Sequence, residues 1–334
     1  MKILFDHPLP FALAHGGVQV QIEQTKAALE RRGHEVEFSR WWDDRQTGSL
    51  IHYWSVPQPA YLRMAREKGI PVVVTHTFSA TCNRPLSRLK LQGTLTRAFF
   101  AVPGLRGLAT QLSWQSFRLA DRMVVGLQAE RRVLETVFGV TGDRVATVPL
   151  GLNQAFLNAG KPTRSEPRLI TTGTITEVKR CVVLAQMARA AQVPILFVGK
   201  PYNPGDSYWK SFAALIDGHF VQHRDHVSST DELIGLLQAS RGFVLFSKYE
   251  NWSLSAHEAA ACGLPVLLPD QPWSRECFGD NASYLHDAGV LSNAAKLRAF
   301  YDAAPTMPAP EMKFYSWDDV AERLEACYRS LLAR

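Results

Sequence analysis

The sequence has few cysteines and no long apolar run. Its 334 residues include five cysteines, an odd and scattered set without metal-ligand spacing, so no disulfide framework is indicated. The opening run, Met1 to Asp6, is too short for a signal peptide, and no segment approaches the length that spans a membrane. These absences favour a protein of the reducing cytoplasm.

Acidic residues are absent from position 69 to position 120, in a chain whose net charge is +6. The stretch is also rich in leucine and phenylalanine. Two interpretations fit it equally well: a surface that binds anionic lipid at the inner face of a membrane, or a helical hairpin whose apolar side chains pack inward. Residues 84–118 are therefore a candidate membrane contact, whereas nucleic acid is disfavoured because the aromatic residues form no stacking pattern. The basic residues of the stretch are Arg84, Arg88, Lys90, Arg97, Arg106 and Arg118.

The dinucleotide fingerprint Gly-x-Gly-x-x-Gly is also absent. The chain nevertheless opens like a doubly wound α/β fold, with a strand at residues 2–5, a helix that starts at Gly16 and Gly17, and a strand at residues 35–38. Paired glycines at a helix start let a phosphate approach the backbone closely, although a plain helix-entry turn accounts for them as well. Because 46% of the residues are hydrophobic, a chain of this length can bury two cores, and we expect two domains.

The most informative pattern is a turn between two apolar strands, which we predict at residues 242–246 and 264–268. Between them we expect a short helix at residues 254–262. Glu250 and Glu258 bracket the start of this helix, whose free amides are suited to binding phosphate. Carboxylates accept hydrogen bonds from hydroxyls, so the layout suits a ligand with hydroxyls on both sides of a phosphate group. A nucleotide-sugar has this form.

The spacing Glu-x7-Glu, followed by Ala-Cys-Gly-Leu-Pro-Val, resembles the signature of the retaining glycosyltransferases of family 4. The resemblance implies the GT-B fold: two doubly wound, Rossmann-like domains that face a cleft. It places an acceptor-side domain at residues 1–158, a nucleotide-sugar-binding domain at residues 168–312, and a C-terminal helix within residues 313–334 that returns to the first domain. The polar, proline-rich residues 159–167 read as the linker by composition.

The resemblance also implies residue roles around the turn. Glu250 would hold hydroxyls of the transferred sugar and Glu258 those of the ribose. From the first domain, His76 at a strand end would contact the sugar, and the loop of Gly16 and Gly17 would face the diphosphate. The diphosphate would bind the amides of the intervening turn, Asn251, Trp252, Ser253 and Leu254.

The loop that opens the second domain departs from the family pattern. In the family it reads Gly-Arg-Leu, three variable residues, then Lys-Gly, and its Arg and Lys neutralise the departing diphosphate. Gly173 and Lys179 match, while Thr174 replaces the Arg and Arg180 replaces the last Gly. A threonine cannot act as a charged fork, so either Arg180 restores the charge or donor affinity or activity is reduced.

We therefore expect a retaining hexosyltransferase that moves a sugar from a nucleotide-diphosphate sugar to a sugar or lipid-linked acceptor, in cell-envelope glycan or glycolipid synthesis. No cofactor and no metal are expected: Asp43 and Asp44, which follow two tryptophans, read as a solvated loop. Two alternatives stay open. One is a nucleotide-sugar epimerase of the same fold, and the other is a non-catalytic protein that binds nucleotide-sugars.

Overall fold

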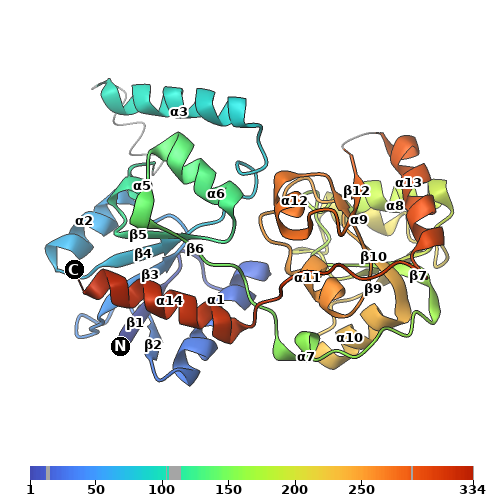
Figure 1. Ribbon diagram of the computed structural model, residues 1–334, viewed down its shortest axis with the longest axis horizontal. Coiled ribbons are helices and arrows are strands. Elements are labelled where there is room, and N and C mark those ends of the chain that lie inside the picture. Colours follow the sequence, from blue (N-terminus) through green and yellow to red (C-terminus); the bar gives the residue numbers. More distant parts are fainter. Residues whose placement is uncertain (13–15, 103, 105–113, 287–288, 334) are drawn as a thin grey trace. The chain divides into compact units, whose positions relative to one another are not determined.

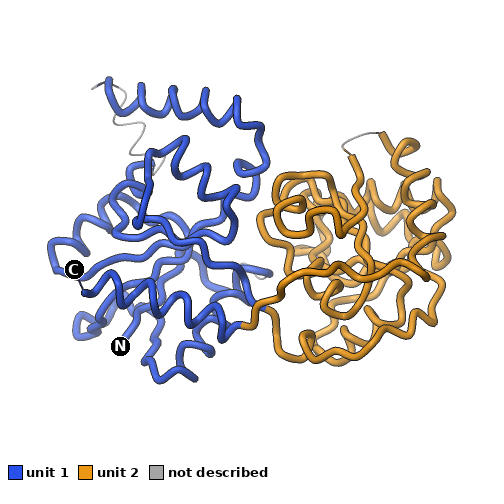
Figure 2. Tube along the Cα trace, in the orientation of Figure 1, with its two compact units in different colours: residues 1–151, 317–334 blue, residues 152–316 orange. Residues whose placement is uncertain are grey.

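A computed structural model describes residues 1–12, 16–102, 104, 114–286 and 289–333. The chain forms two compact units, coloured separately in Figure 2. The first comprises Met1–Gly151 together with Trp317–Arg334, and the second comprises Leu152–Ser316. No helix in the described part of the chain is both long enough and apolar enough to cross a membrane.

The first unit is built on a six-stranded parallel sheet with the strand order β2-β1-β3-β4-β5-β6 (Figure 1). Its central strands are short and almost completely buried, because helices cover a parallel sheet on both faces. Because the strands are all parallel, their carboxyl ends lie at one edge of the sheet. The strands are β1 (Lys2–Asp6), β2 (Glu35–Phe38), β3 (Leu50–Trp54), β4 (Val72–Thr75), β5 (Arg122–Val125) and β6 (Val145–Thr147).

The helices of this unit include one from the far end of the chain. Helix α14 (Trp317–Leu332) packs on α1 (Gly17–Arg31), as Figure 1 shows. Its buried Tyr328 hydroxyl lies 2.6 Å from Nδ1 of His52, whose Nε2 lies 2.6 Å from the Thr75 hydroxyl. Burial lowers the pKa of His52 to about 3, so the imidazole is neutral and links α14 to the strands. The other helices are α2 (Pro59–Glu67), α3 (Leu86–Ala101), α5 (Trp114–Leu119), α6 (Gln128–Val133) and the π-helical turn η2 (Leu134–Phe138).

Helix α3 lies at the border of the first unit (Figure 1). It has two different apolar faces, one buried and one exposed. The face with Leu89 and Gly93 packs against η2, where a Cβ on Gly93 would overlap the Thr136 carbonyl oxygen. The opposite face exposes Leu91 and Leu95, by 63% and 54%. The apolar residues of the acid-free stretch are therefore only partly packed inward. Arg106, which belongs to the same stretch, lies outside the described residues.

The second unit repeats the architecture with the strand order β12-β11-β10-β7-β8-β9, again all parallel. These strands are β7 (Glu166–Thr172), β8 (Ile195–Val198), β9 (Val221–Arg224), β10 (Ser240–Val244), β11 (Val266–Pro269) and β12 (Ser283–Leu285). Its helices are α7 (Gln154–Leu157), α8 (Cys181–Ala191), α9 (Ser207–Ala213), α10 (Thr230–Ala239), α11 (Leu254–Ala261), α12 (Pro272–Phe278) and α13 (Val290–Ala303). Two doubly wound domains are thereby confirmed.

Two backbone segments, at Gly173 and Gly199, approach each other closely at the edge of the second sheet. Gly199, which follows β8, has a φ of +151°, and a Cβ at this position would overlap the carbonyl oxygen of Gly173. Gly199→Ala should therefore lower the free energy of unfolding by about 2 kcal/mol or more. The measurement is urea unfolding of the full chain.

Gly235→Ala is the matched control, because Gly235 lies in α10 with open space around it. That change should raise the free energy of unfolding by about 0.5–1 kcal/mol, the ordinary gain from replacing a helical glycine. Equal effects of the two substitutions would contradict the close approach.

Candidate active site

The candidate site of the second unit begins where β10 ends. The chain stays buried through Ser247, turns at residues 248–252, and enters α11 at Leu254. Ser253 caps this helix, since its hydroxyl accepts a hydrogen bond from the Ala256 amide at 3.3 Å. Gly263, with a φ of +82°, ends the helix as the sequence indicated.

Glu250 lies in this turn and is joined to a loop from another strand. Its carboxylate forms an ion pair with Lys179 and also accepts a hydrogen bond of 2.9 Å from the Ser247 hydroxyl. Lys179 belongs to the loop that follows β7, which is the neighbour of β10 in the sheet. The Lys248 amide donates to the Val178 carbonyl at 2.7 Å, so the two loops are also joined through their backbones. Two residues 71 positions apart thus meet at the carboxyl edge of the sheet.

The rest of the β7 loop lies around the same pair. Gly173 has a φ of +144°, and the Lys179 side chain passes close to it. Arg180 has a left-handed backbone (φ +51°), the conformation in which glycine is unstrained, and its guanidinium lies 5.2 Å from the centre of the Phe246 ring. A second cation is therefore present beside Lys179, whereas Thr174 is a partly buried neutral residue.

The aromatic residue of the turn is fixed by a histidine that sequence reasoning missed. Trp252 stacks on the buried His257 ring, with centroids 4.4 Å apart and planes 11° apart. Nδ1 of His257 lies 2.7 Å from the Ser253 carbonyl oxygen, and burial lowers the pKa of His257 to about 4. The ring is therefore neutral and donates from Nδ1. The periodicity of α11 could have shown that residue 257 faces inward, but not that Trp252 would fold back onto it.

Glu258 is the second carboxylate of the turn. It is partly buried in the second turn of α11, and burial raises its pKa to about 7. Among the residues that the structure describes, none donates a hydrogen bond to its carboxylate. A desolvated carboxylate without a donor is suited to accept hydroxyl groups of a ligand.

The candidates of the first unit lie at the carboxyl edge of its own sheet. Gly16, with a φ of +137°, precedes the first residue of α1, Gly17, whereas residues 13–15 lie outside the described part. His76 follows β4, with its ring edge-on to Phe78 at 4.6 Å, and burial lowers its pKa to about 4. The fully buried Glu130 holds this loop by accepting a 2.7 Å hydrogen bond from the Phe78 amide.

The described residues at the two sheet edges include no preformed metal-binding cluster. No group of three His, Cys, Asp or Glu side chains in the described ranges is placed to hold a metal ion. Asp43 and Asp44 lie in an exposed or partly exposed loop, and Asp43 pairs with Arg40 at 3.0 Å.

Comparison with known proteins shows which family the second unit resembles and which proteins are similar to the chain. Residues 166–306 match the family described as glycosyl transferases group 1. The D-inositol 3-phosphate glycosyltransferase of Mycobacterium leprae is 27% identical over 307 residues, which cover 83% of this chain and 68% of that protein. Its counterpart from Mycobacterium avium is 28% identical over 306 residues, with the same two shares.

Solved structures agree on the fold. HepE of Anabaena, in complex with UDP and glucose, superposes with a TM-score of 0.67 at 15% identity, over 99% of this chain and 100% of that one. Sucrose-phosphate synthase from Thermosynechococcus elongatus gives a TM-score of 0.65 at 15% identity, over 100% and 97% of the two chains. The fold is therefore GT-B, with two Rossmann-like domains. The sequence matches, on this fold, support a glycosyltransferase of the family 4 type.

The raised pKa of Glu258 predicts how stability depends on pH. The folded state holds a proton up to about pH 7 that the unfolded chain releases near pH 4.5, so the free energy of unfolding should fall as the pH rises through this window. Glu258→Gln should remove this dependence, a difference on the order of 2 kcal/mol between pH 4.5 and pH 7.5. Urea unfolding at a series of pH values measures it.

Glu311→Gln is the control, because Glu311 is exposed in the same unit. Its pH profile should follow that of the wild type. Parallel profiles for the wild type and Glu258→Gln would show that Glu258 is ionised normally in the folded state.

Proposed function

We propose that this glycosyltransferase moves a hexose from a nucleotide-diphosphate sugar to an acceptor hydroxyl, with retention of the anomeric configuration. The observation that carries the proposal is the meeting of Lys179 with Glu250 beside the start of α11. Lys179 supplies a cation for the diphosphate and Glu250 supplies a carboxylate for sugar hydroxyls, and the two side chains are in direct contact. The complex of HepE with UDP and glucose supports a donor of this chemistry.

The donor diphosphate is assigned to the amides of residues 251–254 and to the cations of the β7 loop. Lys179 and Arg180 would neutralise the charge that develops on the leaving nucleotide diphosphate, which is why no metal is invoked. When the donor binds, Lys179 exchanges the Glu250 carboxylate for phosphate oxygens, and Glu250 becomes free to accept sugar hydroxyls. The assignments of Gly16, Gly17 and His76 to the donor rest on the family resemblance.

The two glutamates should have separable roles. Glu258→Ala should weaken the affinity for free nucleotide diphosphate about tenfold or more, because a carboxylate that accepts ribose hydroxyls makes charge-assisted hydrogen bonds. Glu250→Ala should keep that affinity and lower turnover instead, since its partner is the sugar. Calorimetry with uridine, guanosine and adenosine diphosphates and a transfer assay measure the two effects.

Glu311→Ala, at an exposed carboxylate of the same unit, should change neither quantity. Unchanged nucleotide affinity in both Glu250→Ala and Glu258→Ala would refute the assignment. Incubation with the nucleotide-sugar alone separates this function from its alternatives: an epimerase would convert the donor sugar without an acceptor, and a binding protein would leave it intact with every acceptor.

The acceptor side of the proposal includes a membrane contact through helix α3 and its flanks, for synthesis of a cell-envelope glycan or glycolipid. Leu91 and Leu95 are exposed one helical turn apart, on the face opposite the packed Leu89. The exposed basic side chains Arg84, Arg88 and Lys90 lie beside this apolar face, and no acidic residue offsets them. Basic and apolar groups on one exposed surface favour peripheral attachment to anionic lipid.

Changing Arg84, Arg88 and Lys90 together to Glu should abolish sedimentation with anionic vesicles at low salt. Each basic residue near such a surface contributes about 1 kcal/mol, so loss of three lowers the partition constant by about a hundredfold. High salt should release the wild type. Arg63, Lys68 and Arg132, all exposed in the same unit, give a control triple change to Glu with the same charge difference. Equal sedimentation of the two triple variants would reject α3 as the contact.

A further inference from the structure

The loop after β2 exposes two neighbouring tryptophans. Trp41 and Trp42 are 80% and 81% exposed, although large aromatic side chains are usually buried or held in an interface. From the sequence we predicted a solvated loop here, because Asp43 and Asp44 follow the two tryptophans. Exposure on this scale at two consecutive positions calls for a ligand surface.

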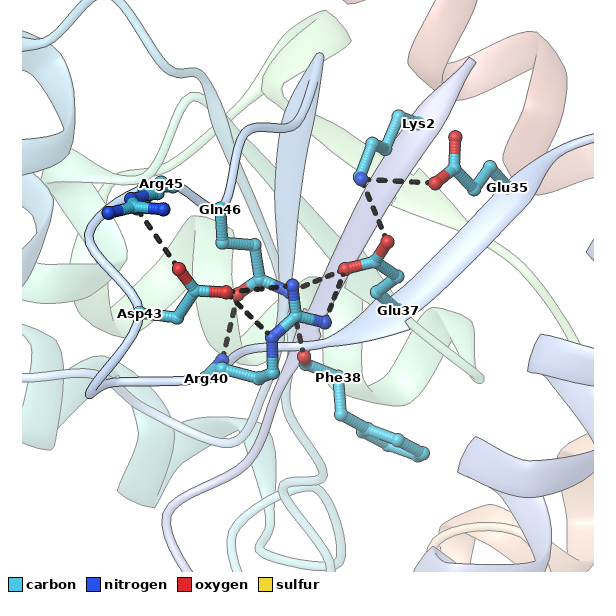
Figure 3. A network of polar contacts seen from close by, with 8 residues as sticks. All are labelled: Lys2, Glu35, Glu37, Phe38, Arg40, Asp43, Arg45 and Gln46. Carbon is cyan, nitrogen blue, oxygen red and sulfur yellow. Dashed lines mark hydrogen bonds and ion pairs between the residues drawn. The ribbon is translucent and has the colours of Figure 1, made fainter.

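A network of polar contacts surrounds the segment that carries these tryptophans (Figure 3). The Arg40 guanidinium donates to Glu37 at 2.8 Å and to Asp43 at 3.0 Å, on either side of the tryptophan pair. The Gln46 side chain donates to Glu37 at 2.7 Å and accepts from the Arg40 amide at 2.8 Å.

Strand β1 completes this network through Lys2, which pairs with Glu37 at 2.8 Å. The hydrogen bond from Lys2, followed by that from Gln46, lowers the pKa of Glu37 to about 2, so its carboxylate stays ionised. The loop is thus fastened at both ends to the sheet. The backbone that carries the two tryptophans is therefore tied to the sheet on both sides of the pair, and we call these two side chains the platform.

The platform borders a pocket of about 280 Å³ in the first unit. The pocket lies where β1 and β2 end, the edge at which parallel α/β sheets bind ligands. Its wall is aromatic with a few polar groups, as in small-molecule sites. The side chains that line it include Asp6, His7, Phe11, Phe38, Trp41 and Trp42.

The Asp6 carboxylate lines the pocket and provides a hydrogen-bond acceptor whose position is fixed by Tyr61. One carboxylate oxygen, Oδ2, accepts a 2.7 Å hydrogen bond from the Tyr61 hydroxyl. Burial, and then the Asp6 charge, hold the pKa of Tyr61 well above its usual value, so this hydroxyl remains a donor. No other side chain in the described part of the chain donates to the Asp6 carboxylate, which leaves Oδ1 able to accept from a ligand.

We propose that this pocket binds a sugar ring of the acceptor, with Trp41 and Trp42 stacking on its apolar C–H face and Asp6 accepting from its hydroxyls. The inference rests on the proposed transfer function, which requires an acceptor, and adds the residues that bind a sugar of that acceptor. A pyranose has flat faces of C–H groups and a rim of hydroxyls, which match the electron-rich faces of the aromatic rings and the carboxylate. The carboxylates of Asp6, Asp43 and Asp44 disfavour an anionic lipid headgroup at this place.

The test uses the full chain and methyl hexopyranosides of the gluco, galacto and manno series as probes. Saturation-transfer NMR should show contact at the axial C–H groups of at least one probe. The double change Trp41→Ala and Trp42→Ala should weaken that probe about tenfold or more, as expected when a central aromatic anchor is truncated. Trp41→Phe with Trp42→Phe should retain most of the affinity, and Asp6→Asn should weaken it while leaving the C–H contact pattern unchanged.

Tyr202→Ala, at an exposed aromatic residue of the second unit, is the matched control and should bind the probe as the wild type does. Equal affinities of the wild type and the double alanine variant would overturn the proposal. Preferential binding of choline, or of octanol, over every hexopyranoside would also overturn it and identify a cation or an apolar group as the occupant.

Calorimetry with the nucleotide diphosphates keeps this result separate from the proposed function. The double alanine variant should bind nucleotide as the wild type does, because neither tryptophan is among the residues to which the donor is assigned. Wild type that binds nucleotide but no hexopyranoside would disprove the acceptor pocket alone. Wild type that binds no nucleotide would instead disprove the donor assignment.

Discussion

Parallel pairing of every strand is the constraint on which both candidate sites depend. In a parallel sheet all the strand-to-helix loops leave from one edge, so residues far apart in sequence meet there. Lys179 follows β7 and Glu250 follows β10, and they pair because those strands are neighbours. The same rule brings Asp6 at the end of β1 beside the tryptophan loop that follows β2. The chemistry of each unit is thus concentrated at one border of its sheet, while the helices on the faces supply the core.

Ionised and neutral polar groups have different tasks at these edges. His52 and His257 are buried and neutral, with pKa values of about 3 and 4, and they fix the positions of neighbouring side chains. Lys179 and Glu250 are charged partners, and Lys179 keeps a quarter of its side chain exposed. Glu258 is intermediate between the neutral histidines and the charged pair, because burial raises its pKa to about 7. Small changes in its surroundings on ligand binding would therefore change its charge near neutral pH.

The departures from the family pattern have structural counterparts. Arg180 adopts the left-handed backbone that suits the glycine it replaces, and its guanidinium lies beside Phe246 at the edge where Thr174 provides no charge. Trp252, in the turn before α11, is folded back onto His257. The altered residues thus keep a cation and an ordered turn at the carboxyl edge of the second sheet, which is consistent with a functional donor site.

The sequence by itself determined the opening strand–helix–strand unit, the turn between Glu250 and Glu258, and the family resemblance, because apolar runs, glycine stops and a fixed spacing are local signals. Helices α9, α12 and α13 were not predicted. The first two have 7 residues each, too few to show a helical period, whereas the buried positions of α13 (293, 294, 297, 300 and 301) do follow one and could have been recognised. Only the tertiary structure decided that Lys179 reaches Glu250, that His257 supports Trp252, and that Arg40, Gln46 and Lys2 hold Trp41 and Trp42 over a pocket. The pairing of Lys179 with Glu250 and of Lys2 with Glu37 depends on which strands are neighbours, and the stacking of Trp252 on His257 depends on how deeply the histidine is buried. Neither property is encoded in the residues next to it along the chain.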